Sequence, residues 1–337
     1  MYTKIVIPEF GSPQKLQVVQ ETELPHPESG EVRLKMLATS ACFTDLLVIS
    51  NQYPDVKQKP PFSPGYDIIG QVDALAGDVH TLKIGQIVAG MPQYSAHQDY
   101  LCLPVDRLVP VPDGLDPAEA VSMVLSYMTA FQMLHRVAKV KAGQRILIHG
   151  AGGAVGTALL QLGHRVGLEM YGTGSADKQE FIESLGAVPI DYQKQDFVTH
   201  LAELAPNGMH AVFDGIGGDY YARSFKTLTR GGTLVAYGFL KTAMGRGGSI
   251  PLEFMRLMLL NALPNGKKAK FYSINGLRNQ HPEWFKQDLQ ALFELLQAGK
   301  VKPFIEKRMP LSQATEALSL VEKGAVKGKI VLLPDAN

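Results

Sequence analysis

The chain has 337 residues, of which 45% are hydrophobic and 19% charged, and its 33 basic and 32 acidic residues leave a formal net charge of +1. This length favours two domains, and the even balance of charges argues against a nucleic-acid-binding surface. Two cysteines form no disulfide framework, the first residues lack the pattern of a secretion signal, and no apolar run is long enough to span a bilayer, so we expect a cytoplasmic protein without nucleic-acid or membrane partners.

The first 108 residues contain short β-type runs separated by turn residues, such as EVRLKMLAT and IIGQVDAL on either side of KQKPPFSPG. This pattern predicts a largely β unit, with one helix from Thr44 to Ser50 that begins on a threonine cap. Cys42 stands just before that helix. A cysteine in this position can hold a zinc ion, act as a nucleophile or simply pack, and the local sequence leaves all three open.

From Asp116 onward the pattern changes. Asp116-Pro117 begins a helix, and a second helical stretch covers Tyr127 to Val137. Strands and helices then alternate up to GTLVAYGF, which predicts a parallel sheet with helices on both faces. Towards the end, FYSI reads as a strand, PEWFKQDLQALFELLQAG as a helix and KGKIVLL as a closing strand.

A glycine-rich turn lies between a strand and a helix in RILIHGAGGAVGTALLQLG. Gly153 leaves room for a pyrophosphate, Gly156 allows the helix to approach the strand, and the helix N-terminus offers amide donors. The strand–turn–helix context makes this a dinucleotide-binding fingerprint, although a βα turn that binds nothing is the alternative. The candidate cofactor-binding residues here are Gly150, Ala151, Gly152, Gly153, Ala154, Val155 and Gly156.

The end of the next strand selects between the two nicotinamide cofactors. An acid there would favour NAD, but the chain has Thr173, Gly174 and Ser175, followed by Lys178. Small donors and a cation suit a 2′-phosphate, so NADPH is the predicted cofactor, with Tyr192 closing the same pocket. Two alternatives to this NADPH prediction are left open. Asp177 could turn into the pocket, or Lys178 could be a solvated helix residue that contacts no phosphate.

The order of these parts, with VFDGIGG, GRGGTLVAYGF and KGKIVLL, resembles the medium-chain dehydrogenase/reductase superfamily. Within it, ACFTDLLVISNQYP, PFSPGYDIIGQV, SYMTAFQML and HGAGGAVG resemble the zinc-independent quinone oxidoreductase group. The resemblance implies an α/β fold with a central Rossmann domain at 125–274 and a GroES-like, mostly β substrate domain formed by 1–124 and 275–337. It also implies a homodimer joined partly through the edge of the Rossmann sheet near FYSI.

The resemblance also bears on a catalytic metal. The zinc-dependent branch holds its metal with a cysteine, a histidine and a second cysteine. Cys42 matches the first ligand, but Tyr66 stands at the histidine position and Leu125 at the last cysteine. Phenol and leucine side chains are not substitutes for these ligands, so no metal is expected.

Without zinc, hydride addition to a conjugated acceptor is the easiest remaining chemistry, because the negative charge spreads over the acceptor. Tyr53 matches a tyrosine of related reductases and is the expected proton donor, with a packed loop tyrosine as the alternative. Cys42 stands where quinone reductases usually have asparagine, so it either lines the substrate pocket with Tyr66 or is an inert buried thiol. Asp45 is expected to orient its neighbours.

Further candidates follow by position in the resemblance and at the strand ends: Thr129, Gly215, Ile216, Gly238, Phe239, Phe271 and Tyr272. The predicted protein is an NADPH-dependent, zinc-independent oxidoreductase that transfers hydride to a quinone or another conjugated carbonyl. The alternatives are an enoyl-thioester reductase and a non-catalytic NADPH-binding interaction protein.

Overall fold

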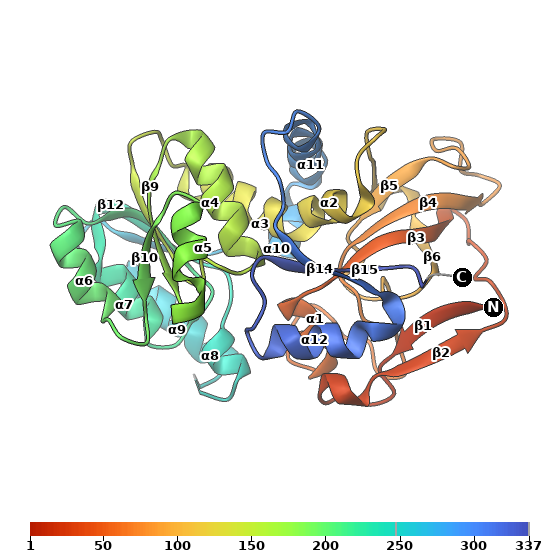
Figure 1. Ribbon diagram of the computed structural model, residues 1–337, viewed down its shortest axis with the longest axis horizontal. Helices are drawn as coiled ribbons and strands as arrows, with labels where there is room; N and C mark the ends of the chain where they lie inside the picture. Colours follow the sequence, from red (N-terminus) through yellow and green to blue (C-terminus); the bar gives the residue numbers. More distant parts are fainter. Residues whose placement is uncertain (247, 336–337) are drawn as a thin grey trace. The chain divides into compact units, whose positions relative to one another are not determined.

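The computed structural model describes residues 1–246 and 248–335. The chain divides into two compact units, Met1–Met128 with Phe285–Asn337, and Thr129–Trp284, whose limits lie slightly further along the chain than the predicted domain boundaries. Figure 1 traces the chain through both units. No helix in the described part of the chain combines the length and the apolar composition that crossing a membrane would require.

The unit of residues 129–284 is built on a six-stranded parallel sheet in the order β10-β9-β8-β11-β12-β13. The chain moves outward from β8 through β9 to β10 and then returns to the other side of β8 at β11. This reversal creates a switch point between β8 and β11, where doubly wound sheets bind ligands at the carboxyl ends of the strands. The strands are β8 (Arg145–Ile148), β9 (Glu169–Gly174), β10 (Val188–Asp191), β11 (Met209–Asp214), β12 (Leu228–Ala236) and β13 (Lys268–Phe271).

Helices connect these strands and lie beside them in Figure 1. Helix α4 packs against β9, α5 against β9 and β10, α7 against β11 and β12, and α9 against β13. The central strands are buried along almost their whole length, which explains their continuous apolar runs. The helices are α3 (Met128–Gln132), α4 (Ala154–Val166), α5 (Gln179–Ser184), α6 (Phe197–Leu204), α7 (Tyr220–Lys226), α8 (Leu240–Ala243), α9 (Ile250–Asn261) and α10 (Ile274–Gln280).

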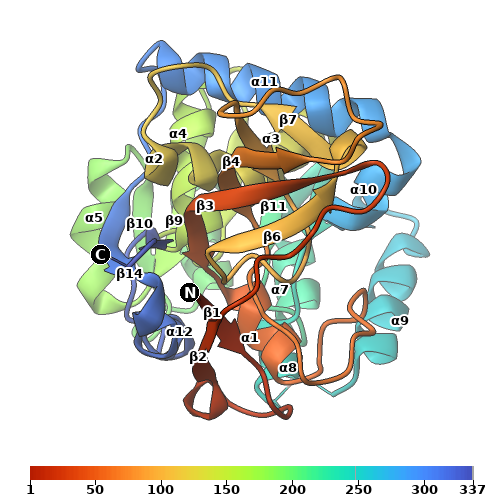
Figure 2. The same ribbon diagram turned by 90° about the vertical axis from the view of Figure 1, so that its right-hand side faces the viewer.

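The other unit contains a seven-stranded sheet in which residues from both ends of the chain are neighbours. Its order is β14-β15-β3-β4-β5-β7, and β6 also pairs with β3. Figure 2 shows β3 flanked by β4 and β6. Strand β15 pairs antiparallel with β3, so Ile330 lies opposite Ala41. This arrangement, together with the parallel sheet, confirms the predicted α/β fold with a GroES-like unit.

The remaining elements have the following bounds. The strands are β1 (Tyr2–Val6), β2 (Gln17–Glu21), β3 (Glu31–Ala41), β4 (Ile68–Leu75), β5 (Ile87–Gly90), β6 (Tyr100–Pro104), β7 (Leu108–Pro110), β14 (Ile305–Pro310) and β15 (Lys329–Leu333). The helices are α1 (Phe43–Ile49), α2 (Pro117–Ser122), α11 (Pro282–Gln297) and α12 (Ala314–Glu322). Short 3₁₀ turns occur at Pro13–Lys15, Val105–Arg107, Ala176–Lys178 and Leu311–Gln313.

Three predicted elements differ in detail. Helix α1 begins at Phe43 on a Cys42 cap rather than on Thr44, because the Asp45 carboxylate accepts a hydrogen bond from the Cys42 backbone N–H. The strand predicted at FYSI ends at Phe271, because Ser273 accepts a hydrogen bond from the Gly276 N–H and caps α10. The helix predicted from Tyr127 to Val137 contains π-helical stretches at 123–127 and 133–138 on either side of α3.

Candidate functional site

The glycine turn lies at the carboxyl end of β8, on the switch point of the sheet. A Cβ at Gly156 would stand 2.4 Å from the Gly150 carbonyl oxygen and 2.6 Å from the Ala151 Cα, so the first turn of α4 tolerates no side chain there. Gly153 is the N-cap of α4, and Ala154 is its first residue. The N–H groups of the first turn have no acceptor within the helix. The turn therefore presents amide donors at the point where a pyrophosphate would bind.

A buried chain of hydrogen bonds holds this turn. His149 Nε2 lies 2.9 Å from Ser224 Oγ, which donates to Asp214 Oδ2 at 2.7 Å, and His149 Nδ1 lies 3.1 Å from Thr173 Oγ1. The Gly150 N–H donates to the same Thr173 hydroxyl at 3.3 Å. Burial lowers the pKa of His149, which favours the neutral ring that donates through Nε2 and accepts through Nδ1. The Thr173 hydroxyl is therefore already engaged in supporting the turn.

The same chain reaches the turn after β11. Asp214 Oδ1 accepts hydrogen bonds from the Ile216 N–H at 2.8 Å and the Gly217 N–H at 3.1 Å. The end of β12 lies against this turn, because a Cβ at Gly238 would stand 3.0 Å from the Gly215 carbonyl oxygen. The predicted residues Gly215, Ile216 and Gly238 therefore lie together at the carboxyl ends of β11 and β12. His149, Asp214 and Ser224 were not predicted as site residues, although a histidine directly before Gly150 in RILIHG was a readable signal.

Lys178 approaches the glycine turn from the neighbouring strand end. A Cβ at Gly152 would stand 2.8 Å from Lys178 Cδ, which places the lysine side chain across the turn. Ser175 donates to Asp177 Oδ1 at 2.5 Å, so an acid does lie beside the predicted phosphate pocket. Tyr192 is 47% exposed, and its N–H donates to the Gly174 carbonyl at 3.4 Å.

Aromatic residues gather at the ends of β12 and β13. Phe239 stacks on Phe271 with ring centroids 5.7 Å apart and planes 5° from parallel. The buried Tyr272 hydroxyl donates to Gln132 Oε1 at 2.9 Å, and Gln132 lies one turn after the buried Thr129 on α3. The predicted residues Thr129, Phe239, Phe271 and Tyr272 therefore lie on adjoining elements of one unit.

In the other unit, Cys42 and Asp45 form a buried pair. The Cys42 thiol donates to Asp45 Oδ2 at 3.0 Å, and Asp45 Oδ1 accepts from the Gly65 N–H at 3.2 Å. Burial, reinforced by the Asp45 carboxylate, raises the pKa of the Cys42 thiol well above its ordinary value. Burial also raises the pKa of Asp45. The thiol is therefore protonated at neutral pH and serves as a local hydrogen-bond donor.

Tyr53 and Tyr66 lie together in this unit. Their hydroxyl oxygens are 2.7 Å apart, and their rings meet edge to face. Tyr66 is fully buried, whereas Tyr53 is partly exposed. The next residue, Asp67, forms a buried ion pair with Lys329, 3.3 Å between Oδ2 and Nζ.

Two family models match the chain. The alcohol dehydrogenase GroES-like domain matches residues 28–113, and the zinc-binding dehydrogenase domain matches residues 185–332. A quinone oxidoreductase from Pseudomonas syringae pv. Tomato has a similar structure, with a TM-score of 0.88 and 25% identity over 99% of this chain and 100% of that chain.

The chain is thus similar in both of its units to proteins of the medium-chain dehydrogenase/reductase superfamily.

Other proteins that are similar to this chain have names that point to different activities. The human synaptic vesicle membrane protein VAT-1 homolog-like is 28% identical over 97% of this chain and 80% of its own length. The mycobacterial protein Rv1454c, solved in complex with NADPH, has a TM-score of 0.87 and 27% identity over 99% of this chain and 100% of that chain. The CurK enoyl reductase, at 23% identity and a TM-score of 0.85 over 99% of both chains, shares the fold. This superfamily of oxidoreductases does not by itself resolve the substrate class.

The name of the second matching domain raises the question of zinc. Among residues 1–246 and 248–335, no group of three or more histidine, cysteine, aspartate or glutamate side chains is arranged to hold a metal ion. Cys42 has Asp45 as its hydrogen-bond partner, while the phenol of Tyr66 and the apolar Leu125 occupy the two other positions that the zinc-dependent branch uses.

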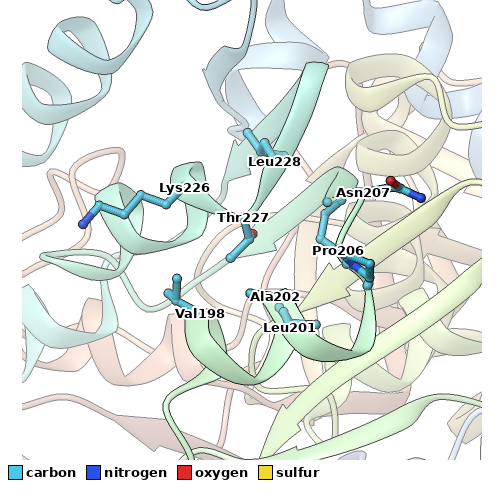
Figure 3. A pocket seen from close by; sticks show the side chains of 11 residues that line it. Val198, Leu201, Ala202, Pro206, Asn207, Lys226, Thr227 and Leu228 are labelled. Carbon is cyan, nitrogen blue, oxygen red and sulfur yellow. The ribbon is translucent and has the colours of Figure 1, made fainter.

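A surface hollow of about 200 Å³ lies at the opposite ends of the strands, where β11 and β12 begin (Figure 3). It has no histidine, cysteine or carboxylate in its lining, and it is far along the strands from the glycine turn, so it adds no catalytic group to the site. Its lining residues are Val198, Leu201, Ala202, Ala205, Pro206, Asn207, Gly208, Met209, Lys226, Thr227 and Leu228.

Proposed function

We propose that this protein is an NADPH-dependent, zinc-independent oxidoreductase that reduces a quinone or another conjugated carbonyl. The observation that carries the proposal is the turn at the carboxyl end of β8, where backbone atoms leave no space for a side chain at Gly156 and the Lys178 side chain lies against Gly152. The NADPH complex of Rv1454c and the likeness to a quinone oxidoreductase support the cofactor and the reaction class.

The residues of the parallel-sheet unit suit NADPH. The amides of Gly152 and Ala154 would hold the pyrophosphate, and Lys178 with Tyr192 would border the 2′-phosphate. Thr129, Gly215, Ile216, Gly238 and Phe239 would border the nicotinamide end, with Phe271 and Tyr272 behind them. The bound cofactor supplies a hydride from C4 of its nicotinamide.

The chain itself has to orient the acceptor and provide a proton. We assign the proton to the Tyr53 hydroxyl, because it is partly exposed while its neighbour Tyr66 is fully buried. Since negative charge on a reduced quinone or enone is delocalised, hydrogen-bond donors are sufficient and no Lewis acid is required. The protonated Cys42 thiol donates to the Asp45 carboxylate in the first turn of α1 and is not a nucleophile in this scheme.

A homodimer is the assembly that we propose. Strand β13 is the last strand of its sheet, so its outer edge is open to pairing within the described chain. Helix α9, which packs against β13, exposes Met255 at 50%, Met258 at 72% and Leu259 at 61%. A second copy that covers both features would remove an apolar surface from water.

The test is NADPH oxidation followed optically in chelator-treated protein, with an ortho-quinone and crotonyl-CoA assayed side by side and NADH as the control cofactor. Faster turnover of the quinone with NADPH than with NADH supports the proposal. Reduction of crotonyl-CoA alone would favour an enoyl-thioester reductase. Tight NADPH binding with no acceptor reduced would favour a non-catalytic binding protein.

A further inference from the structure

Tyr66 is fully buried, and hydrogen bonds hold the residues on both sides of it. It lies between Gly65, whose N–H donates to Asp45 Oδ1 at 3.2 Å, and Asp67, whose carboxylate accepts from the Ser40 N–H at 2.9 Å. The Asp67 carboxylate also pairs with Lys329. A Cβ at Gly65 would stand 2.3 Å from the His97 nitrogen, so the backbone next to Tyr66 packs directly against that of His97. The Tyr66 ring therefore projects from a fixed point in a dry environment.

Tyr53 has a less constrained position. It lies in the loop after α1, attached through its N–H to the Leu47 carbonyl at 3.1 Å. Its ring meets that of Tyr66 at 87° with the centroids 5.6 Å apart, and the two hydroxyl oxygens are 2.7 Å from each other. The contact with Tyr66 therefore helps to fix where the Tyr53 hydroxyl lies.

The short contact between two hydroxyls has a chemical consequence. Only one proton can occupy the line between the two oxygen atoms, so one tyrosine donates and the other accepts. When Tyr66 donates, the Tyr53 proton lies off the line between the two oxygen atoms, which is the arrangement in which Tyr53 can act as an acid. The Tyr53 oxygen left behind is negative, and a hydrogen bond to an ionised acceptor is stronger than one to a neutral acceptor.

We propose that Tyr66 is the positioning residue of Tyr53, holding its hydroxyl in place and stabilising the phenolate that forms when Tyr53 donates its proton. The inference rests on the proposed function. In the step, hydride addition leaves the acceptor oxygen negative, the Tyr53 O–H bond breaks, and its proton forms a new O–H bond on the acceptor. Tyr53 then recovers a proton from water.

The experiment compares Tyr66→Phe, Tyr53→Phe and the double variant in chelator-treated protein, with Tyr2→Phe as a control. Tyr2 is a buried tyrosine of the same unit that packs edge to face on Tyr100. Loss of one hydrogen bond to an ionised group predicts about a tenfold fall in quinone kcat for Tyr66→Phe. The affinity for NADPH should stay the same, the alkaline limb of the pH–rate profile should move upward, and the double variant should be no slower than Tyr53→Phe alone.

Three outcomes decide the matter. If the wild type reduces no acceptor, the proposed function fails. If the wild type is active and Tyr53→Phe is slow but Tyr66→Phe matches Tyr2→Phe in rate and pH profile, the role of Tyr66 is refuted while the function stands. The role of Tyr66 is also refuted if the falls in kcat of the two single variants multiply in the double variant, because the two residues then act independently. Should Tyr66→Phe fold poorly, Tyr66→His keeps a ring with a donor, and it should retain more activity than Tyr66→Leu at equal melting temperature.

Discussion

Gly156 offers a direct test of the cofactor cradle. The added methyl group of Gly156→Ala would lie 2.4 Å from the Gly150 carbonyl oxygen and 2.6 Å from the Ala151 Cα, and both are backbone atoms of the glycine turn. Backbone cannot rotate away as a side chain does, so α4 must move from β8 or the turn must open. Overpacking of this kind costs about 1–3 kcal/mol, which is only partly offset by the better helix propensity of alanine.

The matched control is Gly163→Ala on the same helix. There the nearest atom to the added methyl group is Met170 Sδ at 2.7 Å, the flexible part of a side chain that can change rotamer. We expect Gly163→Ala to keep wild-type melting temperature and NADPH affinity, while Gly156→Ala lowers both, with at least a tenfold rise in Kd. Calorimetric titration with NADPH and thermal unfolding of each variant measure the two effects. Wild-type NADPH affinity in Gly156→Ala would refute the reasoning.

Four further predictions concern charge, pH and assembly. Lys178→Ala should raise the Kd for NADPH about tenfold and leave NADH little changed, because only NADPH carries the 2′-phosphate; equal losses would contradict this. Asp177→Asn should strengthen NADPH binding, as measured by titration, since it removes a negative charge that lies beside Ser175. The pKa of His149 is lowered on folding, so as the pH falls the unfolded chain binds a proton before the folded chain does, and the free energy of unfolding should fall below about pH 6.5. In urea unfolding of His149→Asn, the free energy of unfolding should fall less steeply over the same pH range. Met258→Glu should convert a dimer to a monomer in light scattering without loss of fold, and an unchanged mass would exclude α9 from the interface.

The sequence was sufficient for features that depend on neighbouring residues. RILIHGAGGAVG places a strand, a turn and a helix in order, and the structure places Gly156 in contact with Gly150 and Ala151 because the helix must fold back on the strand that precedes it. The alternation of strands and helices likewise determined the parallel sheet. The Cys42–Asp45 hydrogen bond is also local, as the two residues lie three apart. Even so, the sequence could not decide whether Cys42 lines a pocket or is an inert buried thiol, because burial is not visible in the local sequence.

Only the tertiary structure decided the contacts between distant segments. His149, Thr173, Ser224 and Asp214 come from different elements, and their hydrogen-bonded chain exists because parallel strands end at one edge of the sheet. The Asp67–Lys329 pair joins residues far apart in the chain, because β15 returns beside β3. Tyr53 and Tyr66 were each singled out by position, but their hydroxyl contact depends on how the loop after α1 folds over the start of β4. Local propensity and periodicity specify elements, whereas pairs of side chains such as this one are specified by the packing of those elements.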